Sequence, residues 1–174
     1  MARSPDRRLQ IFIQNMNNIV LFSPFSQKLR NNQQNPKNYP YWQDLITMLR
    51  QSGKVDEIWQ IGVGNEYRFE GTTQKYFNEP FSKISELANK SSVWLSVENF
   101  MPHLCNSYGV STKGIVIFSK SDPLHFGYPQ NINILKDRKY LRSDQFYIWE
   151  QCDFQEEAFV SPQIVFDEIM KILE

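Results

Sequence analysis

Cysteine and histidine are scarce in this sequence. Its 174 residues include two cysteines, Cys105 and Cys152, which do not form a CxxC motif, and two histidines. A disulfide framework or a cysteine-based zinc site needs more thiols than this, and a cluster of metal-ligating side chains usually needs more histidine. We therefore expect neither a disulfide-stapled fold nor a bound metal or other cofactor.

An excess of charge of either sign is also missing. The chain has 19 Lys and Arg against 19 Asp and Glu, so its formal net charge is zero. Proteins that bind nucleic acids usually have a clear basic excess, and we expect no nucleic-acid partner. The balance still permits a small local anion site.

Long apolar runs and common catalytic motifs are absent as well. No segment reaches the length of a membrane span, and the apolar stretch near the N-terminus is soon broken by Gln14, Asn15, Asn17 and Asn18. It therefore makes a poor signal peptide, and we expect a cytoplasmic protein whose residues 1–18 form an N-terminal arm. The sequence contains no GxxxxGK(S/T), HExxH or GxSxG motif, so the chemistries that these motifs serve are not expected.

What the sequence does contain is an alternation of apolar runs and amphipathic segments. Hydrophobic residues make up 41% of the chain, enough for the core of one domain over residues 19–174. Short apolar runs predict strands buried on both faces, and helical spacing after prolines predicts helices. The predicted strands are 19–22, 57–64, 93–97, 114–118 and 131–135; the predicted helices begin at Pro40, Pro80, residue 100 and Pro162.

This alternation predicts an α/β fold, a Rossmann-like parallel sheet flanked by helices. Residues 65–79 are expected to be a loop, and the pattern of 136–160 is ambiguous. Large aromatic residues on the predicted strands and the first helix are best interpreted as core. In such sheets ligands bind at the carboxyl ends of the strands. A site is therefore expected on the loops that follow the strands, which are 23–38, 62–70, 97–103 and 119–129.

The first two loops contain candidate binding residues. Ser23, Ser26 and Lys37 offer hydroxyls and an ammonium group that can hold a phosphate, although a plain solvated loop is an equally good interpretation. Gly62 and Gly64 let a backbone approach a ligand closely, and Glu66 after them can bind a ribose diol. A simple glycine turn with an exposed glutamate is the more economical interpretation of that second loop.

The third loop predicts an anion site at a helix start. Asn99 is a good N-cap, so the backbone N–H groups of Phe100 and Met101 are expected to be free to bind a diphosphate. His103 lies one turn further and can reach a phosphate oxygen. A lone histidine in a helix is also commonly a hydrogen-bonded packing residue.

Four segments together resemble the donor-binding, C-terminal half of glycosyltransferase family 9, the heptosyltransferase-like enzymes of the GT-B fold. Residues 97–109 (VENFMPHLCNSYG) resemble the family segment Asp-Ser/Thr-Gly-x-x-His-Leu-Ala, and 115–123 (IVIFSKSDP) resemble its strand and Gly-x-Thr-Asp-Pro turn. Residues 37–42 (KNYPYW) are similar to its Lys-x-Trp-Pro segment, and 62–66 (GVGNE) are similar to its Gly-Gly-x-x-Glu turn.

The resemblance implies a role for each candidate residue. The phosphates of a nucleoside-diphosphate sugar would face Ser23, Ser26 and Lys37, and the ribose would bind Glu66. Glu98, in place of the family aspartate, would contact the donor sugar, while Phe100 stands where the family has glycine. The implied activity is transfer of the sugar to a hydroxyl acceptor without a metal.

A full enzyme of this family also has an N-terminal acceptor domain, which residues 1–18 cannot replace. The expected partners are therefore a nucleotide sugar and a second chain or second copy that completes the cleft. The alternatives are a non-catalytic nucleotide-sugar binding module and a degenerate interaction domain.

Overall fold

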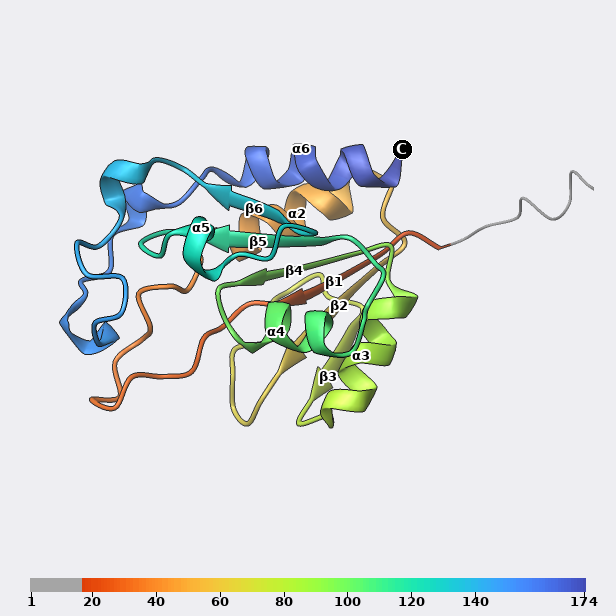
Figure 1. The fold of residues 1–174 in the computed structure, drawn as a ribbon. Coiled ribbons are helices and arrows are strands. Elements are labelled where there is room, and N and C mark those ends of the chain that lie inside the picture. The colour runs from red at the N-terminus through yellow and green to blue at the C-terminus, as the bar shows by residue number, and fades with distance from the viewer. Residues whose placement is uncertain (1–16) are drawn as a thin grey trace, which may run out of the picture.

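The computed structural model describes residues 17–174, and most of the predicted arm at residues 1–18 lies outside the described residues. The described chain folds around one six-stranded sheet with the order β3-β2-β1-β4-β5-β6, in which every pairing is parallel (Figure 1). This is the strand order of dinucleotide-binding Rossmann folds. The strands are β1 (Ile19–Ser23), β2 (Glu57–Gly62), β3 (Gln74–Phe77), β4 (Val93–Val97), β5 (Gly114–Phe118) and β6 (Ile132–Leu135).

Helices cover both faces of the sheet (Figure 1). One face holds α2 (Trp42–Gln51) and α6 (Pro162–Leu173), and the other holds α3 (Phe81–Lys90) and α4 (Phe100–Ser107). The short α5 (Pro123–Phe126) follows β5, and three single turns of 3-10 helix interrupt the ambiguous segment: η1 (Arg138–Tyr140), η2 (Trp149–Gln151) and η3 (Glu156–Ala158).

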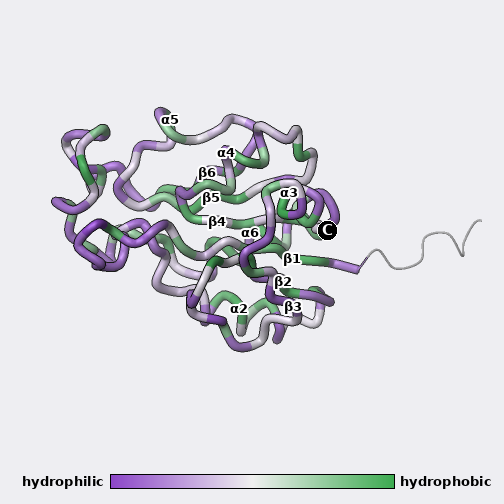
Figure 2. Tube along the Cα trace, turned by 90° about the horizontal axis from the view of Figure 1, so that it is seen from below, coloured by the Kyte–Doolittle hydropathy of each residue, from purple (hydrophilic) through white to green (hydrophobic). Residues whose placement is uncertain are grey.

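The core is split by the sheet because successive strand residues point to opposite faces. In β1, Val20 and Phe22 pack in the cluster under α2 and α6, while Leu21 packs in the cluster under α3 and α4. Figure 2 shows hydrophobic residues along the central strands and hydrophilic ones on many of the surrounding loops. The large aromatics predicted as core are buried: Trp42, Trp59, Trp94 and Phe118.

The prediction that residues 65–79 form only a loop was wrong, because β3 lies within that range. β3 is an edge strand that pairs only with β2, and its sequence Gln-Lys-Tyr-Phe is half-exposed. An edge strand with polar residues lacks the apolar run by which the buried strands were recognised.

Among the described residues, no helix combines the length and hydropathy that crossing a bilayer requires.

Candidate functional site

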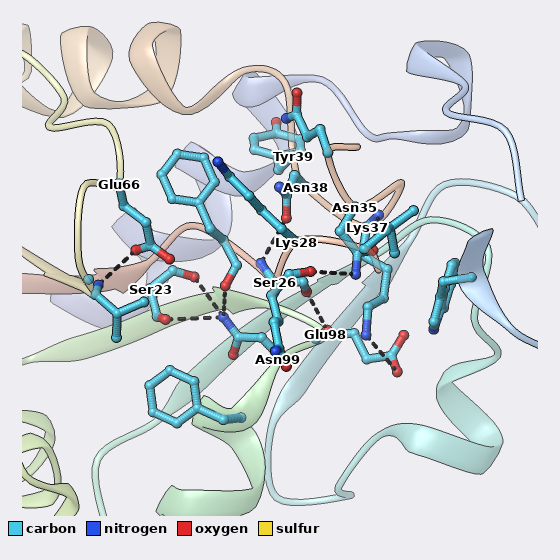
Figure 3. Close-up of a pocket in the computed structure, with 18 of the residues that line it drawn as sticks. Ser23, Ser26, Lys28, Asn35, Lys37, Asn38, Tyr39, Glu66, Glu98 and Asn99 are labelled. Carbon is cyan, nitrogen blue, oxygen red and sulfur yellow. Dashed lines mark hydrogen bonds and ion pairs between the residues drawn. The ribbon is translucent and has the colours of Figure 1, made fainter. Parts of the chain in front are cut away.

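A large cleft opens at the carboxyl ends of β1, β2 and β4, where the fold class predicts a ligand site. Its volume is about 1590 Å³, and it lies between the loop after β1, the loop after β2 and the start of α4. Three segments far apart in the sequence therefore meet at one place. The candidate residues that line the cleft are Ser23, Ser26, Lys37, Gly62, Glu66, Glu98, Asn99, Phe100 and His103; Gly64 does not line it. Figure 3 labels six of them: Ser23, Ser26, Lys37, Glu66, Glu98 and Asn99.

The two serine hydroxyls at the base of the cleft already have protein partners. Ser26 Oγ donates to the Glu98 carbonyl at 3.0 Å, and Ser23 Oγ accepts from the Asn99 side-chain amide at 3.0 Å. Both serines are buried. They tie the end of β1 and the loop after it to the start of α4 (Figure 3), and each hydroxyl keeps capacity for two further hydrogen bonds.

Two buried asparagines shape the loop after β1. Asn38 Oδ1 accepts from the Ser26 backbone N–H at 2.8 Å. Asn35 Oδ1 accepts from the Lys37 backbone N–H at 3.1 Å, and its Nδ2 donates to the Gln27 carbonyl at 3.1 Å. These bonds fix the path of the loop and so the position of Lys37. Asn35 belongs to the polar patch at 31–35 that composition alone presents as a solvated loop, so no sequence signal identifies its role.

Lys37 and Glu98 form an ion pair inside the cleft (Figure 3). Lys37 Nζ lies 3.6 Å from Glu98 Oε1, and the two side chains are 15% and 14% exposed. Burial lowers the pKa of Lys37, and the neighbouring Glu98 opposes that shift. The other carboxylate oxygen, Glu98 Oε2, is buried without a hydrogen-bond partner in the described chain. The pair is therefore under-satisfied, which is costly unless a ligand or water completes it.

One wall of the cleft comes from the ambiguous segment 136–160, to which the sequence alone assigns no role. The ring of Trp149 lines the cleft, with Lys37 Nζ 5.0 Å and the Arg142 guanidinium 3.9 Å from its centroid. Glu150 Oε1 accepts from the Arg30 backbone N–H at 3.1 Å. The Lys37–Trp149 and Arg30–Glu150 contacts anchor the segment to the loop after β1, and their long sequence separation explains why no local pattern reveals them.

The glycine turn after β2 has a structural reason for its first glycine. A Cβ on Gly62 would lie 2.6 Å from the ring of Phe77 on β3, so a side chain there would force that ring to shift. Gly64 has a φ of +53°, which favours glycine, and its N–H donates to Asn78 Oδ1 at 2.9 Å. Glu66 Oε2 accepts from the Val63 backbone N–H at 3.0 Å, and burial raises the pKa of Glu66.

The predicted N-cap at α4 is present, but it uses one of the amides that we expected to be free. Asn99 Oδ1 accepts from the Met101 N–H at 2.9 Å. Its Nδ2 donates to Ser23 and to the Phe25 carbonyl at 3.0 Å. The prediction of two free amides was therefore wrong for Met101, because the same side chain that begins the helix occupies that donor. Phe100 lies at the first position of the helix.

Phe100 and His103 border the cleft from α4. The Phe100 ring stacks on Phe81 of α3, with centroids 5.8 Å apart and an interplanar angle of 21°. His103 is exposed, and its Nδ1 lies 2.9 Å from the Tyr128 hydroxyl. The histidine thus keeps a second ring nitrogen for another partner. Within residues 17–174, no three His, Cys, Asp or Glu side chains gather in a way that would hold a metal ion.

Comparison with known proteins finds similarity in structure and not in sequence. No protein-family model and no curated protein matches the sequence. The glycosyl transferase family 9 structure from Veillonella parvula matches with a TM-score of 0.63 at 10% identity, over 95% of this chain and 49% of that chain. E. coli ADP-heptose LPS heptosyltransferase II matches with a TM-score of 0.60 at 12% identity, over 95% of this chain and 49% of that chain. E. coli heptosyltransferase WaaC, solved with ADP, matches with a TM-score of 0.61 at 14% identity, over 91% of this chain and 45% of that chain.

These likenesses concern the fold, because the identities are low. They confirm the predicted Rossmann-like α/β class, and they agree with the resemblance to glycosyltransferase family 9. The chain spans about half the length of the solved structures that it matches. Its fold is therefore that of one half of a GT-B-like glycosyltransferase.

Proposed function

We propose that this chain binds a nucleoside-diphosphate sugar in the cleft and serves as the donor-binding lobe of a glycosyltransferase. The observation that carries the proposal is the convergence of Lys37, Glu66, Glu98 and His103, from three separate segments of the chain, on one cleft at the carboxyl edge of the sheet. The likeness in fold to solved glycosyltransferases supports it, as does the general use of this sheet edge for nucleotides.

The proposed diphosphate position lies between the loop after β1 and the start of α4. Lys28, Arg30 and Lys37 line that part of the cleft, and the N-terminal end of a helix favours negative charge. Glu98 neutralises much of the charge of Lys37, since the two are paired. We therefore assign Lys37 to a position where it contacts both the phosphate and a sugar hydroxyl, and not phosphate alone.

The proposed sugar position lies at the Lys37–Glu98 pair. A sugar hydroxyl can accept a hydrogen bond from Lys37 and donate one to Glu98 Oε2, the buried oxygen that has no partner in the described chain. At the other end, the Glu66 carboxylate can accept two hydrogen bonds from a ribose diol. The cleft of about 1590 Å³ is large enough for a nucleotide sugar.

Transfer would proceed by attack of an acceptor hydroxyl oxygen on the anomeric carbon of the donor. The new bond is the glycosidic C–O bond, and the bond that breaks joins the anomeric carbon to the diphosphate oxygen, whose electron pair leaves with the diphosphate. The positive groups beside the phosphates stabilise the charge that develops there. The hydroxyl proton goes to a base that the acceptor lobe supplies.

The acceptor lobe is proposed to come from a second chain or a second copy. Phe146 packs on Phe126 with centroids 5.7 Å apart, and Phe146, Leu124 and Tyr147 are 79%, 81% and 50% exposed. Clustered exposed apolar side chains of this kind mark contact surfaces. Among the structures of similar fold, E. coli TibC is a dodecamer and was solved with ADP-D-beta-D-heptose.

A second candidate function, binding without transfer, rests on the charge of the site. Because Glu98 offsets Lys37 and Asn99 occupies the Met101 amide, the cleft offers less positive potential to a leaving diphosphate than an uncompensated lysine and two free amides would. A nucleotide-sugar binding module or an interaction domain would tolerate this arrangement.

Thermal unfolding with a panel of nucleoside diphosphates and their sugars tests the proposal. A ligand at 100 times its Kd stabilises the native state by about 2.7 kcal/mol, or about 5–10 °C for a chain of this size. His103→Ala should reduce that shift and leave the unliganded Tm unchanged, since the side chain is exposed. His125→Ala, outside the cleft lining, is the matched control. If no nucleotide raises the Tm, only the interpretation as an interaction domain remains.

A further inference from the structure

Tyr67 is an exposed aromatic residue at the cleft that the candidate site does not use. It lines the cleft and is 59% exposed, although most large aromatic residues of the sheet are buried. It directly follows Glu66, the proposed ribose ligand. An exposed ring beside a ribose site suggests a function, provided that the ring is held in place.

The backbone around Tyr67 is held by a buried side-chain amide. Gln60, in the middle of β2, is fully buried. Its Nε2 donates to the Tyr67 carbonyl at 2.7 Å, and its Oε1 accepts from the Phe69 N–H at 3.0 Å. A buried amide with both ends bonded is a specific restraint. This clamp fixes the residues on either side of Arg68 relative to the sheet.

Aromatic packing restrains the ring itself. Tyr67 meets Phe69 edge to face, with centroids 4.9 Å apart, and Phe69 in turn stacks on Phe25 at 5.7 Å and contacts Phe22 at 5.9 Å. Arg68 between them points its guanidinium to the ring of Phe77 on β3, 4.6 Å away. Successive side chains thus point in alternate directions, and Tyr67 and Phe69 lie on the cleft side. Tyr67 is the exposed end of a series of packed rings.

We infer that Tyr67 is the stacking platform for the base of the bound nucleotide. The inference rests on the proposed function, because it takes the ribose to lie at Glu66. Every nucleobase presents a flat π-face that can stack on an aromatic side chain. A ring that is already held in position makes that contact with little loss of conformational entropy. The phosphates extend from the ribose toward Lys37, away from the base.

Phe69 and Phe25 form the apolar floor of this nucleobase subsite. Phe69 is buried, and both rings line the cleft. Of the charged residues next to Tyr67 in the chain, Glu66 is assigned to the ribose and Arg68 is turned to β3. The subsite therefore presents an exposed aromatic face above apolar rings, which suits a planar nucleobase.

Isothermal titration with ADP, adenosine and inorganic pyrophosphate, using wild type, Tyr67→Ala and Tyr67→Phe, tests the inference. Loss of one stacked base lowers affinity about 5- to 150-fold, so Tyr67→Ala should weaken ADP and adenosine binding by a factor in that range. Tyr67→Phe should bind like wild type, because the ring remains. Pyrophosphate affinity should be the same in all three proteins. Tyr108→Ala removes a similarly exposed tyrosine, 51% exposed and outside the cleft lining, and should have no effect.

The outcomes separate this inference from the proposed function. If ADP binds wild type and Tyr67→Ala equally well, the stacking role is wrong and the nucleotide site stands. If Tyr67→Ala weakens ADP and pyrophosphate by the same factor, the residue acts on the whole loop and the inference is again wrong. If none of ADP, guanosine diphosphate, uridine diphosphate and pyrophosphate binds wild type, the proposed function itself fails. Circular dichroism and unchanged urea unfolding verify that the variants are folded.

Discussion

Removing one partner of the Lys37–Glu98 ion pair should destabilise the fold more than removing both. At 3.6 Å, two unit charges attract by about 5 kcal/mol when the effective dielectric constant is about 20. Desolvation of both groups opposes that attraction. Each side chain is about one-seventh exposed, so an unpaired charge cannot fully regain its hydration. We expect Lys37→Met and Glu98→Gln each to lower the free energy of unfolding by about 2–4 kcal/mol.

The double variant Lys37→Met/Glu98→Gln should lose much less than the sum of the two single losses. It leaves neither charge of the pair in place, and a neutral amide replaces a carboxylate that had one oxygen without a partner in the described chain. The coupling free energy from the double-mutant cycle should be about 2 kcal/mol or more, whereas independent sites add to within about 0.5 kcal/mol. Urea unfolding of the four proteins, with unchanged m-values, gives these numbers.

The pH dependence of Glu98→Gln provides a second test of the pair. Burial already lowers the pKa of Lys37, and Glu98 opposes this shift, so removing Glu98 lowers the folded-state pKa further. A lysine whose folded pKa lies below its unfolded value of 10.5 destabilises the protein at neutral pH. That penalty disappears as pH rises through the folded pKa toward 10.5. The stability deficit of Glu98→Gln should therefore shrink at alkaline pH, and additive losses or a pH-independent deficit would refute the reasoning.

Three further predictions concern the rest of the fold. Gly62→Ala should lower stability by about 1–3 kcal/mol in urea unfolding, because its Cβ would meet the neighbouring edge-strand ring at 2.6 Å; an unchanged midpoint would show that the ring moves freely. Hydrogen bonds from Arg138 hold the pKa of Asp122 below its usual 3.8, so wild type should lose stability as pH falls through that lower value. Asp122→Asn should be less stable than wild type at neutral pH, and its free energy of unfolding should change less as the pH falls. A loss of stability in acid equal to that of wild type would contradict this. Burial raises the pKa of Cys105 to about 12, so in native protein a thiol reagent should label half-exposed Cys152 first; rapid labelling of both would contradict the burial.

The sheet and its helices were predictable from sequence because their signals are local. Buried parallel strands are continuous apolar runs, and helices such as α6 show a proline start and an apolar stripe. β3 was not predicted because this edge strand is only partly buried and has no continuous apolar run. The position of the cleft followed from the fold class, since the loops after parallel strands meet at one edge.

The details of the cleft depend on contacts between residues far apart in the sequence. Asn99 was predictable as an N-cap, but its second role, donating to Ser23 across 76 residues, has no local pattern. The same is true of Trp149 beside Lys37. The Gln60 clamp is local in sequence, because its partners Tyr67 and Phe69 lie seven and nine residues further along the chain. A glutamine in an apolar strand is the one available hint, because a buried amide must find partners.

The nucleotide site is tested most directly by mapping the binding of ADP onto the backbone of this chain. A 20.7 kDa protein is within reach of two-dimensional amide NMR, and titration with ADP reports every contacted loop at once. We predict that the largest shift changes fall in residues 23–38, 62–70 and 98–103, and that His103→Ala weakens them. Shift changes confined to the opposite, amino end of the sheet, or none at millimolar ADP, guanosine diphosphate and uridine diphosphate, would contradict a nucleotide site in the cleft.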